Sequence, residues 1–266
     1  MRIAFIGGGN MGRAMISAIL NEGLTSPQSI VISDKKPELL TQLRQDFKVF
    51  ITEDNLEAAS RGNIVVLAIK PQNLDEVMAE IKGKLNISQL VLSIIAGRSI
   101  ATLQQGLEHD AIIRAMPNTP AHIGKGITVW TATEGVTQEQ KEKAHAILKA
   151  TGKELYVADE NFIDMSTAIS GSGPAYVFLF MESLIDAAVD IGLPPDTARQ
   201  LVLQTLAGSV EFTAKSDMEL AQLIQMVTSP GGTTAESLKV FENGKFKELI
   251  AQAVNAAYRR AKQLRG

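Results

Sequence analysis

The chain has 266 residues, of which 45% are hydrophobic and 21% charged, and its formal net charge is −3. This is the balance of a globular protein with one large or two modest domains, and it gives no electrostatic reason to expect nucleic acid or an anionic membrane as a partner. With no cysteine and no metal-type spacing among His109, His122 and His145, we expect neither disulfides, nor a thiolate nucleophile, nor a metal site.

The first half of the chain alternates short β-branched runs with helix-like segments. Apolar residues recur at helical spacing over residues 10–23, and Pro37 stands at a favourable first position for a helix over 37–46. The near-continuous apolar run 63–69 is typical of a strand in a parallel sheet that is covered on both faces. We expect strands over residues 2–6, 29–33, 63–69, 89–95, 111–116, 126–130 and 153–157, and a further helix over 137–152. This alternation predicts an α/β fold with a doubly wound sheet.

The second half, from about residue 160, contains no further convincing strand. Pro174 suits the first turn of a long helix, the prolines of LPPDTARQ head another, and three more helical segments follow. We therefore expect an α/β domain over residues 1–160 and an all-helical domain over 161–266, with a ligand in the cleft between them.

The apolar helix expected over residues 174–191 bears on assembly and location. Its polar side chains Glu182, Asp186 and Asp190 stand four apart on one stripe, and nearly all its other positions are apolar. The three charges argue against a membrane span. A helix apolar around most of its girth needs burial on more than one side, which favours a homo-oligomer interface over the centre of a monomeric bundle. Because residues 2–6 run straight into glycines without a targeting pattern, we expect a cytoplasmic protein.

The segment FIGGGNMG, residues 5–12, follows the first expected strand and opens a helix. That is the position of a dinucleotide-binding fingerprint, in which Gly7 permits a tight turn, Gly9 a close approach of the pyrophosphate and Gly12 close packing of helix on strand. The helix N-terminus would offer free N–H groups to the phosphates. The alternative is a plain strand–helix turn in a flavodoxin-like fold. The alternation that follows favours cofactor binding.

The end of the second expected strand carries mixed signals about the cofactor. Asp34 stands where an acidic residue would bind the ribose 2′-OH of NAD. Its neighbours Ser33, Lys35 and Lys36 suit the 2′-phosphate of NADP, or the whole segment is a solvated turn. These residues alone therefore do not decide whether the cofactor is NAD or NADP.

Two stretches of small residues in the second half each open a helix, TAISGSGPAYVF at 167–178 and VTSPGGTTAES at 227–237. The first breaks an apolar region before the helix restarts at Pro174. In the second, Thr233 and Glu236 have the spacing of a capping box. Both stretches could serve only helix capping and close packing, but SPGGTT could also form an anion site at a helix N-terminus, suited to a substrate carboxylate.

Six motifs follow one another along the whole chain: FIGGGNMGRA (5–14), LAIKP (67–71), SIIAG (93–97), IRAMPNTPA (113–121), SGSGPAYVF (170–178) and MVTSPGGTTAESLKVFE (226–242). Together they resemble the pyrroline-5-carboxylate reductase family. The resemblance implies an NAD(P)H-dependent reductase that converts a cyclic imine to proline, with a Rossmann domain and a helical dimerisation domain that forms a homodimer or a larger assembly. The cofactor would be NADP(H), with NAD(H) as the alternative.

The resemblance also implies site residues. Asn55 would contact the adenosine ribose, and Ala96 and Gly97 would lie on the nicotinamide side. Together with the fingerprint, the expected cofactor-binding residues are Ile6, Gly7, Gly8, Gly9, Asn10, Met11, Gly12, Ser33, Asp34, Asn55, Ala68, Lys70, Pro71, Ala96 and Gly97. The expected substrate-binding residues are Ser229, Pro230, Gly231, Gly232, Thr233 and Thr234. Thr234 is the expected catalytic residue, with its hydroxyl near the ring nitrogen.

The chain departs from the family pattern in two places. Many relatives carry a polar or basic residue where Asp34 stands, which weakens a preference for NADP. A charged pair that often precedes the SPGGTT segment is replaced here by Ile224 and Gln225.

Two rival functions can be weighed against this reading. A β-hydroxyacid dehydrogenase would need a lysine at the start of the inter-domain helix, and no lysine occurs between Lys153 and Lys215. A non-catalytic nucleotide sensor could share the fold but would have no use for a carboxylate site at SPGGTT. Imine reduction needs mainly the orientation of two reactants, which fits a site without histidine or metal.

Overall fold

The computed structural model describes residues 1–265, and its chain divides into two compact units. Unit 1 contains Met1–Pro174 together with the chain from Ala256 onward, and unit 2 contains Ala175–Asn255. The chain thus passes from unit 1 into unit 2 and returns. The division falls later than the boundary expected at residue 160, because residues of the first helix after that point are buried within unit 1.

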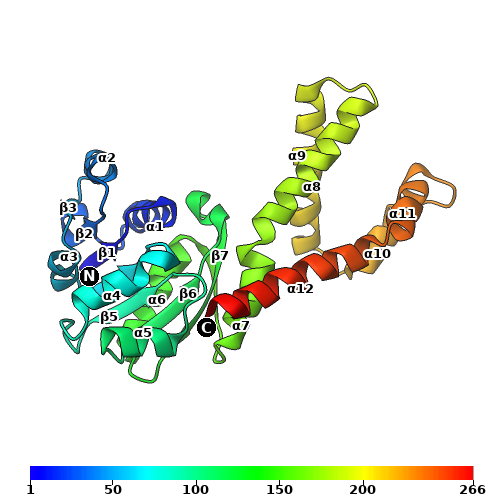
Figure 1. Ribbon diagram of the computed structural model, residues 1–266. Helices are drawn as coiled ribbons and strands as arrows, with labels where there is room; N and C mark the ends of the chain where they lie inside the picture. Colours follow the sequence, from blue (N-terminus) through cyan, green and yellow to red (C-terminus); the bar gives the residue numbers. More distant parts are fainter. Residues whose placement is uncertain (266) are drawn as a thin grey trace. The chain divides into compact units, whose positions relative to one another are not determined.

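Unit 1 is built on one eight-stranded sheet (Figure 1). Its strands are β1 (Ile3–Ile6), β2 (Ile30–Ser33), β3 (Phe50–Thr52), β4 (Ile64–Leu67), β5 (Leu90–Ser93), β6 (Ile112–Met116), β7 (Gly126–Ala132) and β8 (Gly152–Tyr156). The order is β3-β2-β1-β4-β5-β6-β7-β8, and every pair is parallel except β6 with β7. The first six strands have the order of a Rossmann fold, which confirms the predicted doubly wound sheet. The sequence did not predict β3 or the antiparallel pair.

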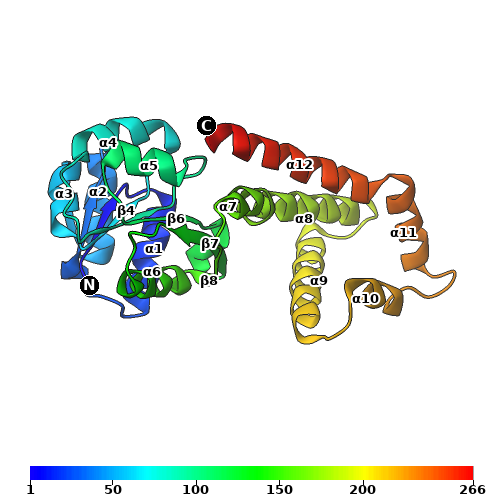
Figure 2. The same ribbon diagram turned by 90° about the horizontal axis from the view of Figure 1, so that it is seen from below.

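Helices cover both faces of the sheet, as Figure 2 shows for α1 and α6 on one side and α4 and α5 on the other. Along β1, Ile3 and Phe5 face the first layer while Ala4 and Ile6 face the second, and all four are fully buried. Burying a large apolar side chain stabilises a fold by about 1.5–3 kcal/mol, so these two interiors hold unit 1 together. The first layer contains α1 (Asn10–Asn21), α2 (Pro37–Phe47) and α6 (Gln138–Ala150), and the second α3 (Asn55–Arg61), α4 (Leu74–Ile81) and α5 (Ile100–Leu107).

Strand order reverses between β1 and β4, which is where a crevice for ligands forms in such sheets. Backbone bonds continue past the strand ends here, from Gly7 N–H to Ser33 O (2.8 Å) and from Ala68 N–H to Ile6 O (2.8 Å). Short 3₁₀ turns connect other elements of unit 1. They are η1 (Pro27–Ser29), η2 (Pro71–Asn73) and η3 (Thr119–Ile123).

A nearly continuous helix leads out of unit 1. Helix α7 (Asn161–Ser166) passes through a π-helical turn, η4 (Thr167–Gly171), into α8 (Gly173–Asp190). The expected interruption before Pro174 is therefore wrong. A π turn takes in an extra residue without ending the helix, and here Ser172 N–H reaches back to Thr167 O at 2.8 Å. Among the residues described, Asn161–Asp190 is the one helix that could cross a membrane on length and composition alone.

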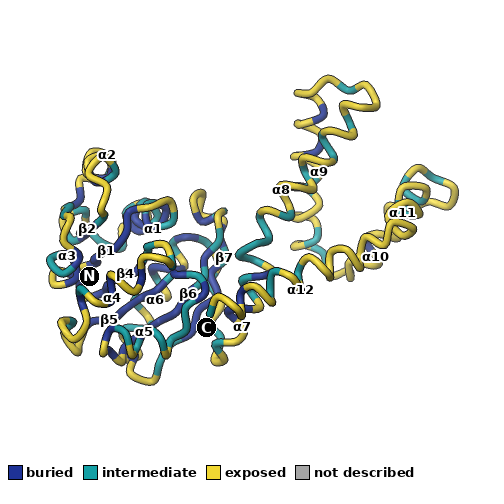
Figure 3. Tube along the Cα trace, viewed as in Figure 1, coloured by how far each residue is buried: buried dark blue, intermediate teal, exposed yellow. Residues whose placement is uncertain are grey.

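Unit 2 is all-helical, as predicted, and buries few of its own apolar side chains (Figure 3). It contains most of α8, then α9 (Pro195–Lys215), α10 (Leu220–Met226), α11 (Thr233–Asn243) and the first part of α12 (Phe246–Arg265). Over residues 175–255, all of which are described, the buried apolar residues are Ala198, Val202 and Leu223. Leu179 is 63% exposed and Val210 70% exposed. Apolar area of this extent marks an interaction surface.

Candidate functional site

The glycine loop between β1 and α1 is specified by its packing. Gly7 has φ +100°, and a Cβ there would lie 2.7 Å from Ala68 O. A Cβ on Gly12 would lie 2.7 Å from Gly7 O, so the first turn of α1 sits directly on the loop. Gly9 differs, since no atom lies within 4 Å of the position a Cβ would take. It is the N-cap of α1 and offers no side-chain cap, which leaves an open approach to a helix N-terminus, the arrangement that binds phosphates.

Asp34, at the end of β2, fixes this loop from the side. Its Oδ2 accepts a hydrogen bond from Gly8 N–H at 2.9 Å and its Oδ1 accepts one from Lys36 N–H at 3.1 Å. The carboxylate thus joins the glycine loop to the turn that precedes α2. A ribose hydroxyl at this point would meet an acceptor that is already oriented.

Two predicted cofactor contacts, Ser33 near a 2′-phosphate and Asn55 at the ribose, bond to each other inside unit 1. The buried Ser33 Oγ donates to Asn55 Oδ1 at 2.7 Å, and Asn55 Nδ2 donates to Glu80 Oε2 at 2.6 Å. Asn55 opens α3, where Asp54 caps the helix. Both side chains lie at the predicted edge of the sheet, but they would have to exchange partners to reach a ribose. Sequence reasoning did not find Glu80, because its partner stands 25 residues away.

The exposed lysine next to Asp34 is also paired. Lys35 Nζ forms an ion pair with the Glu76 carboxylate of α4. The hydrogen bond with Glu76 raises the pKa of Lys35 above its ordinary value, with the nearby charges of Glu76 and Glu80 acting in the same direction. A cation suited to a 2′-phosphate is therefore present, but an acidic side chain already holds it.

The end of β4 lies beside the glycine loop. Ala68 faces Gly7 and Gly12 closely, and Lys70 and Pro71 begin the η2 turn that follows. Lys70 is exposed, and Pro71 O accepts a hydrogen bond from Arg98 Nη2 at 3.3 Å. The LAIKP and SIIAG motifs are connected directly by the bond from Ile94 N–H to Leu67 O at 3.1 Å.

The segment after β5 carries Ala96 and Gly97. Gly97 is buried with φ +66°, and a Cβ there would lie 2.5 Å from Leu264 Cβ near the end of α12. Ala96 beside it is partly exposed. Sequence reasoning missed Leu264, since it is separated from Gly97 by most of the chain. All the predicted cofactor residues lie in unit 1.

The SPGGTT segment forms the N-terminus of α11 in unit 2. Gly232 is the N-cap without a side-chain cap, and Gly232 N–H bonds to Ser229 O at 3.0 Å with Gly231 at φ +70°. This turn starts the helix one residue before Thr233 can cap it, so the predicted capping box is wrong. The Glu236 carboxylate instead accepts from Lys239 Nζ at 2.7 Å.

The first turn of α11 can hold an anion. Its leading N–H groups have no partner within the helix, and the positive end of the helix dipole lies there. Thr234, partly buried, is the second residue of the helix. All the predicted substrate residues lie in unit 2. Among the residues described, no group of three or more His, Asp or Glu side chains could hold a metal ion.

Comparisons with known proteins agree with both halves of this description. Residues 2–97 match the family model described as "NADP oxidoreductase coenzyme F420-dependent", and residues 160–264 match "Pyrroline-5-carboxylate reductase dimerisation". Pyrroline-5-carboxylate reductase from Synechocystis is 41% identical over 99% of this chain and 98% of its own length, and that from Pseudomonas aeruginosa is 39% identical over 99% and 96%.

Solved structures give the same answer. A pyrroline-5-carboxylate reductase from Coxiella burnetii has a TM-score of 0.90 and 38% identity, covering 100% of this chain and 98% of that one. The pyrroline carboxylate reductase of Plasmodium falciparum, solved with NADP bound, has a TM-score of 0.91 and 34% identity over the same shares. The resemblance drawn from the six motifs is therefore confirmed, and the chain belongs to the pyrroline-5-carboxylate reductase family.

Proposed function

We propose that this protein reduces 1-pyrroline-5-carboxylate to L-proline, the last step of proline synthesis, with hydride from NAD(P)H. The observation that carries the proposal is the presence of two uncapped helix N-termini in a chain that belongs to this family. One opens α1 behind the glycine loop, and the other opens α11 at Gly232. The first suits a pyrophosphate and the second a small carboxylate.

The residues of unit 1 fit a nicotinamide dinucleotide. The open space beside Gly9 leaves room for phosphate oxygens, while the packing of Gly7 and Gly12 fixes the loop around it. Ala68, Lys70 and Pro71 would line the cofactor at the end of β4, and Ala96 and Gly97 would lie on its nicotinamide side. The related Plasmodium falciparum protein binds NADP, and NADP(H) is the proposed cofactor here, with NAD(H) as the alternative.

Asp34 and Lys35 bear on the choice between these cofactors. The Asp34 carboxylate favours a ribose that carries hydroxyls, because a 2′-phosphate beside it would add a like charge. Lys35 would favour a 2′-phosphate only after giving up Glu76. The protein should therefore use both cofactors, and the ratio of the two rates measures the balance between these side chains.

The residues of unit 2 would bind and orient the imine. The substrate carboxylate would accept N–H groups from Ser229 to Thr234, where a charge at a helix N-terminus is stabilised by about 0.3–1 kcal/mol or more if partly buried. The Thr234 hydroxyl would hydrogen-bond the ring nitrogen. The bound cofactor supplies the hydride that adds to the C=N carbon. The nitrogen takes its proton from solvent, because a threonine hydroxyl is a weak acid.

The proposed working form is a homodimer or a larger assembly built on it, located in the cytoplasm. The match to a dimerisation domain supports a homo-oligomer, and the exposed apolar side chains of α8 and α9 support unit 2 as its interface. Unit 2 would then obtain from a second copy the burial that it lacks within one chain.

The test follows loss of reduced nicotinamide absorbance, with NADPH and separately with NADH, in the presence of pyrroline-5-carboxylate. We expect substrate-dependent oxidation with both cofactors. Folded protein that binds NADPH but oxidises neither cofactor would overturn the proposal. Binding of proline without any turnover would then favour a nucleotide sensor.

A further inference from the structure

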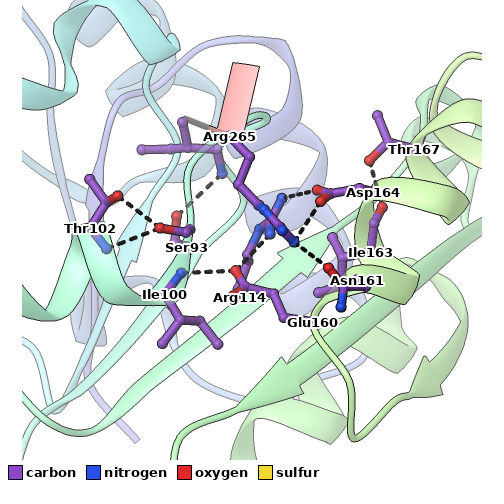
Figure 4. Close-up of polar contacts among 12 residues, drawn as sticks. Ser93, Ile100, Thr102, Arg114, Glu160, Asn161, Ile163, Asp164, Thr167 and Arg265 are labelled. Atoms are coloured by element: carbon purple, nitrogen blue, oxygen red, sulfur yellow. Dashed lines mark hydrogen bonds and ion pairs between the residues drawn. The ribbon is translucent and has the colours of Figure 1, made fainter. Parts of the chain in front are cut away.

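A buried cluster of charges surrounds Arg114 of β6, and none of its side chains is among the predicted cofactor or substrate residues (Figure 4). Arg114 is 2% exposed, and its Nη1 donates to Glu160 Oε1 at 2.6 Å while its Nη2 donates to Asp164 Oδ1 at 2.8 Å. Asp164, on α7, is also 2% exposed. Paired buried charges of this kind are fixed in place, because breaking them leaves an uncompensated charge.

A second arginine joins the cluster from the far end of the sequence. Arg265, on the last turn of α12, places Nη1 2.8 Å from Asp164 Oδ2 and donates to Asn161 Oδ1 at 2.9 Å. Figure 4 shows Arg114 and Arg265 converging on Asp164. Arg114 alone would leave the two carboxylates with one negative charge in excess, and Arg265 balances that charge. Its contacts also hold the end of α12 against α7.

The same contacts reach the segment Ile94–Ser99, which joins β5 to α5. Glu160 Oε1 accepts Ile100 N–H at 2.8 Å, the first residue of α5. Leu264, next to Arg265, covers Gly97 so closely that a Cβ there would lie 2.5 Å from its Cβ and 3.2 Å from its carbonyl oxygen.

The opposite side of this segment is held by the turn and helix that follow β4. Arg98 Nη2 donates to Pro71 O at 3.3 Å, and Arg98 Nη1 lies 3.9 Å from Asp75 Oδ1. Segment Ile94–Ser99 therefore lies between two supports, one at the predicted cofactor crevice and one at the end of α12. The second support depends on Leu264 and Arg265.

We infer that Leu264 and Arg265 are positioning residues for cofactor binding, acting through segment Ile94–Ser99. The inference rests on the proposed function, since that assigns Ala96 and Gly97 to the nicotinamide side. Loss of the Arg265 contacts would release the end of α12, and Leu264 would no longer hold Gly97. The segment would then sample other positions, and the affinity for reduced nicotinamide cofactor would fall while the substrate residues of unit 2 stayed as they are.

The test compares Arg265→Ala and Leu264→Ala with Arg260→Ala. The control removes the same charge from the same helix, and the recorded contact of Arg260 is with Gln263 on that helix. We expect Arg265→Ala to raise the Kd and KM for NADPH by about tenfold, the effect of one charge-assisted contact, with the KM for pyrroline-5-carboxylate unchanged. Arg265→Lys should recover part of the affinity. Leu264→Ala should act in the same direction, and Arg260→Ala should match the unchanged protein.

The inference would be overturned if the Arg265→Ala and Leu264→Ala proteins fold and have the same Kd for NADPH as the unchanged protein. If Arg265→Ala does not fold, Arg265→Lys and Leu264→Ala carry the same comparison. An equal rise in the KM for both substrates would also overturn it, because a merely structural defect affects both.

Hydrogen exchange separates this inference from the proposed function. NADPH should slow amide exchange over residues 94–99 in the unchanged protein, and Arg265→Ala should speed exchange there without cofactor. Absence of NADPH protection would refute the assignment of Ala96 and Gly97 and the inference with it. Protection by NADPH together with an unaltered Kd in Arg265→Ala would refute the inference alone.

Discussion

The two units solve the problem of burying apolar surface in different ways. In unit 1, β1, β4 and β5 are buried along their whole lengths and helices cover both faces of the sheet. In unit 2, side chains of the same character, such as Leu179 and Val210, remain exposed. Unit 1 thus buries its apolar side chains within the chain, whereas unit 2 leaves exposed the apolar side chains that we propose a second copy covers.

The two glycine segments differ in the same way. Gly7 and Gly12 are fixed by backbone atoms of neighbouring elements, but no atom lies within 4 Å of the position a Cβ would take on Gly231. Packing within the chain therefore specifies the loop proposed to bind the cofactor. For the SPGGTT segment, proposed to bind the substrate, it specifies only the turn that begins α11.

The largest expected effect on stability comes from removing one of the buried charges of unit 1. Asp164→Ala leaves Arg114 without one of its two partners, and the loss of one member of a buried pair lowers the free energy of unfolding by about 3–5 kcal/mol. The matched control is Glu211→Ala in unit 2, which breaks the exposed ion pair with Lys215. This variant should change the free energy of unfolding by about 0.5 kcal/mol or less. Chemical denaturation of both variants measures the contrast. Equal effects would contradict it.

An apolar position of unit 2 should respond through assembly rather than through the fold of the chain. Leu179→Asp places a charge on the exposed apolar surface, and we expect the dissociation constant of the homo-oligomer to rise at least about 100-fold, roughly 3 kcal/mol. Ser183→Asp introduces the same residue one turn later at a position that is already polar. Sedimentation of both variants tests this, and an intact assembly in Leu179→Asp would exclude this face of α8 from the interface.

The glycine loop offers a pair of variants that separate packing from binding. Gly7→Ala meets Ala68 O at 2.7 Å with φ +100°, so we expect a loss of about 2 kcal/mol in the free energy of unfolding and loss of NADPH binding. Gly9→Ala enters open space at an N-cap and should lower stability by about 1 kcal/mol or less. It should nevertheless weaken NADPH binding, because its methyl group occupies the space proposed for the pyrophosphate. Unaltered NADPH affinity in Gly9→Ala would place the pyrophosphate elsewhere.

Thr234 tests the proposed role of the second loop. Thr234→Val removes the hydroxyl but keeps the shape, and we expect kcat/KM for the imine to fall by about tenfold, the value of one hydrogen bond of about 1.4 kcal/mol. NADPH affinity should not change. Thr233→Val, at the exposed neighbouring position, is the control, because valine keeps the backbone N–H that the proposal assigns to the substrate carboxylate. An unchanged kcat/KM in Thr234→Val would remove Thr234 from the reaction.

The smallest expected effect concerns cofactor preference. Glu76→Gln removes the carboxylate whose hydrogen bond raises the pKa of Lys35, so that pKa should return toward its ordinary value. The freed ammonium could then meet a 2′-phosphate, and the ratio of NADPH to NADH activity should rise. NMR titration of the lysine side chain and the two steady-state rates test this. A ratio that falls would contradict the position proposed for the 2′-phosphate.

The sequence predicts structure correctly where that structure depends on residues that are close together in the chain. The continuous apolar run of β4 and the loop FIGGGNMG carry their own signals, one as a buried strand and the other as a turn that only small residues fit. Strand β3 was missed because its three residues, Phe50–Thr52, are only partly buried and lack such a run. The start of α11 was misplaced by one residue, because the positive φ of Gly231 and the turn at Ser229 decide it rather than the T-x-x-E spacing.

Contacts between distant parts of the sequence gave no such signal. Arg114 and Asp164 are 50 residues apart, and Arg265 and Asn161 are 104 apart. Each charge alone fits a solvated surface equally well. Only the fold reveals that β6, α7 and the end of α12 meet at one point. The sequence likewise gives no sign that Ser33 bonds to Asn55, although it predicts both as cofactor-binding residues.

The most direct test of the central claim is the stoichiometry of the reaction in a single vessel. The purified protein is incubated with NADPH and pyrroline-5-carboxylate. The amount of NADPH oxidised and the amount of L-proline formed are then measured in the same sample. We predict one mole of proline for each mole of NADPH oxidised, with neither change when the imine is left out. Oxidation of NADPH without proline, or no oxidation by protein that binds NADPH, would contradict the assignment of the two helix N-termini to a cofactor and an imine carboxylate.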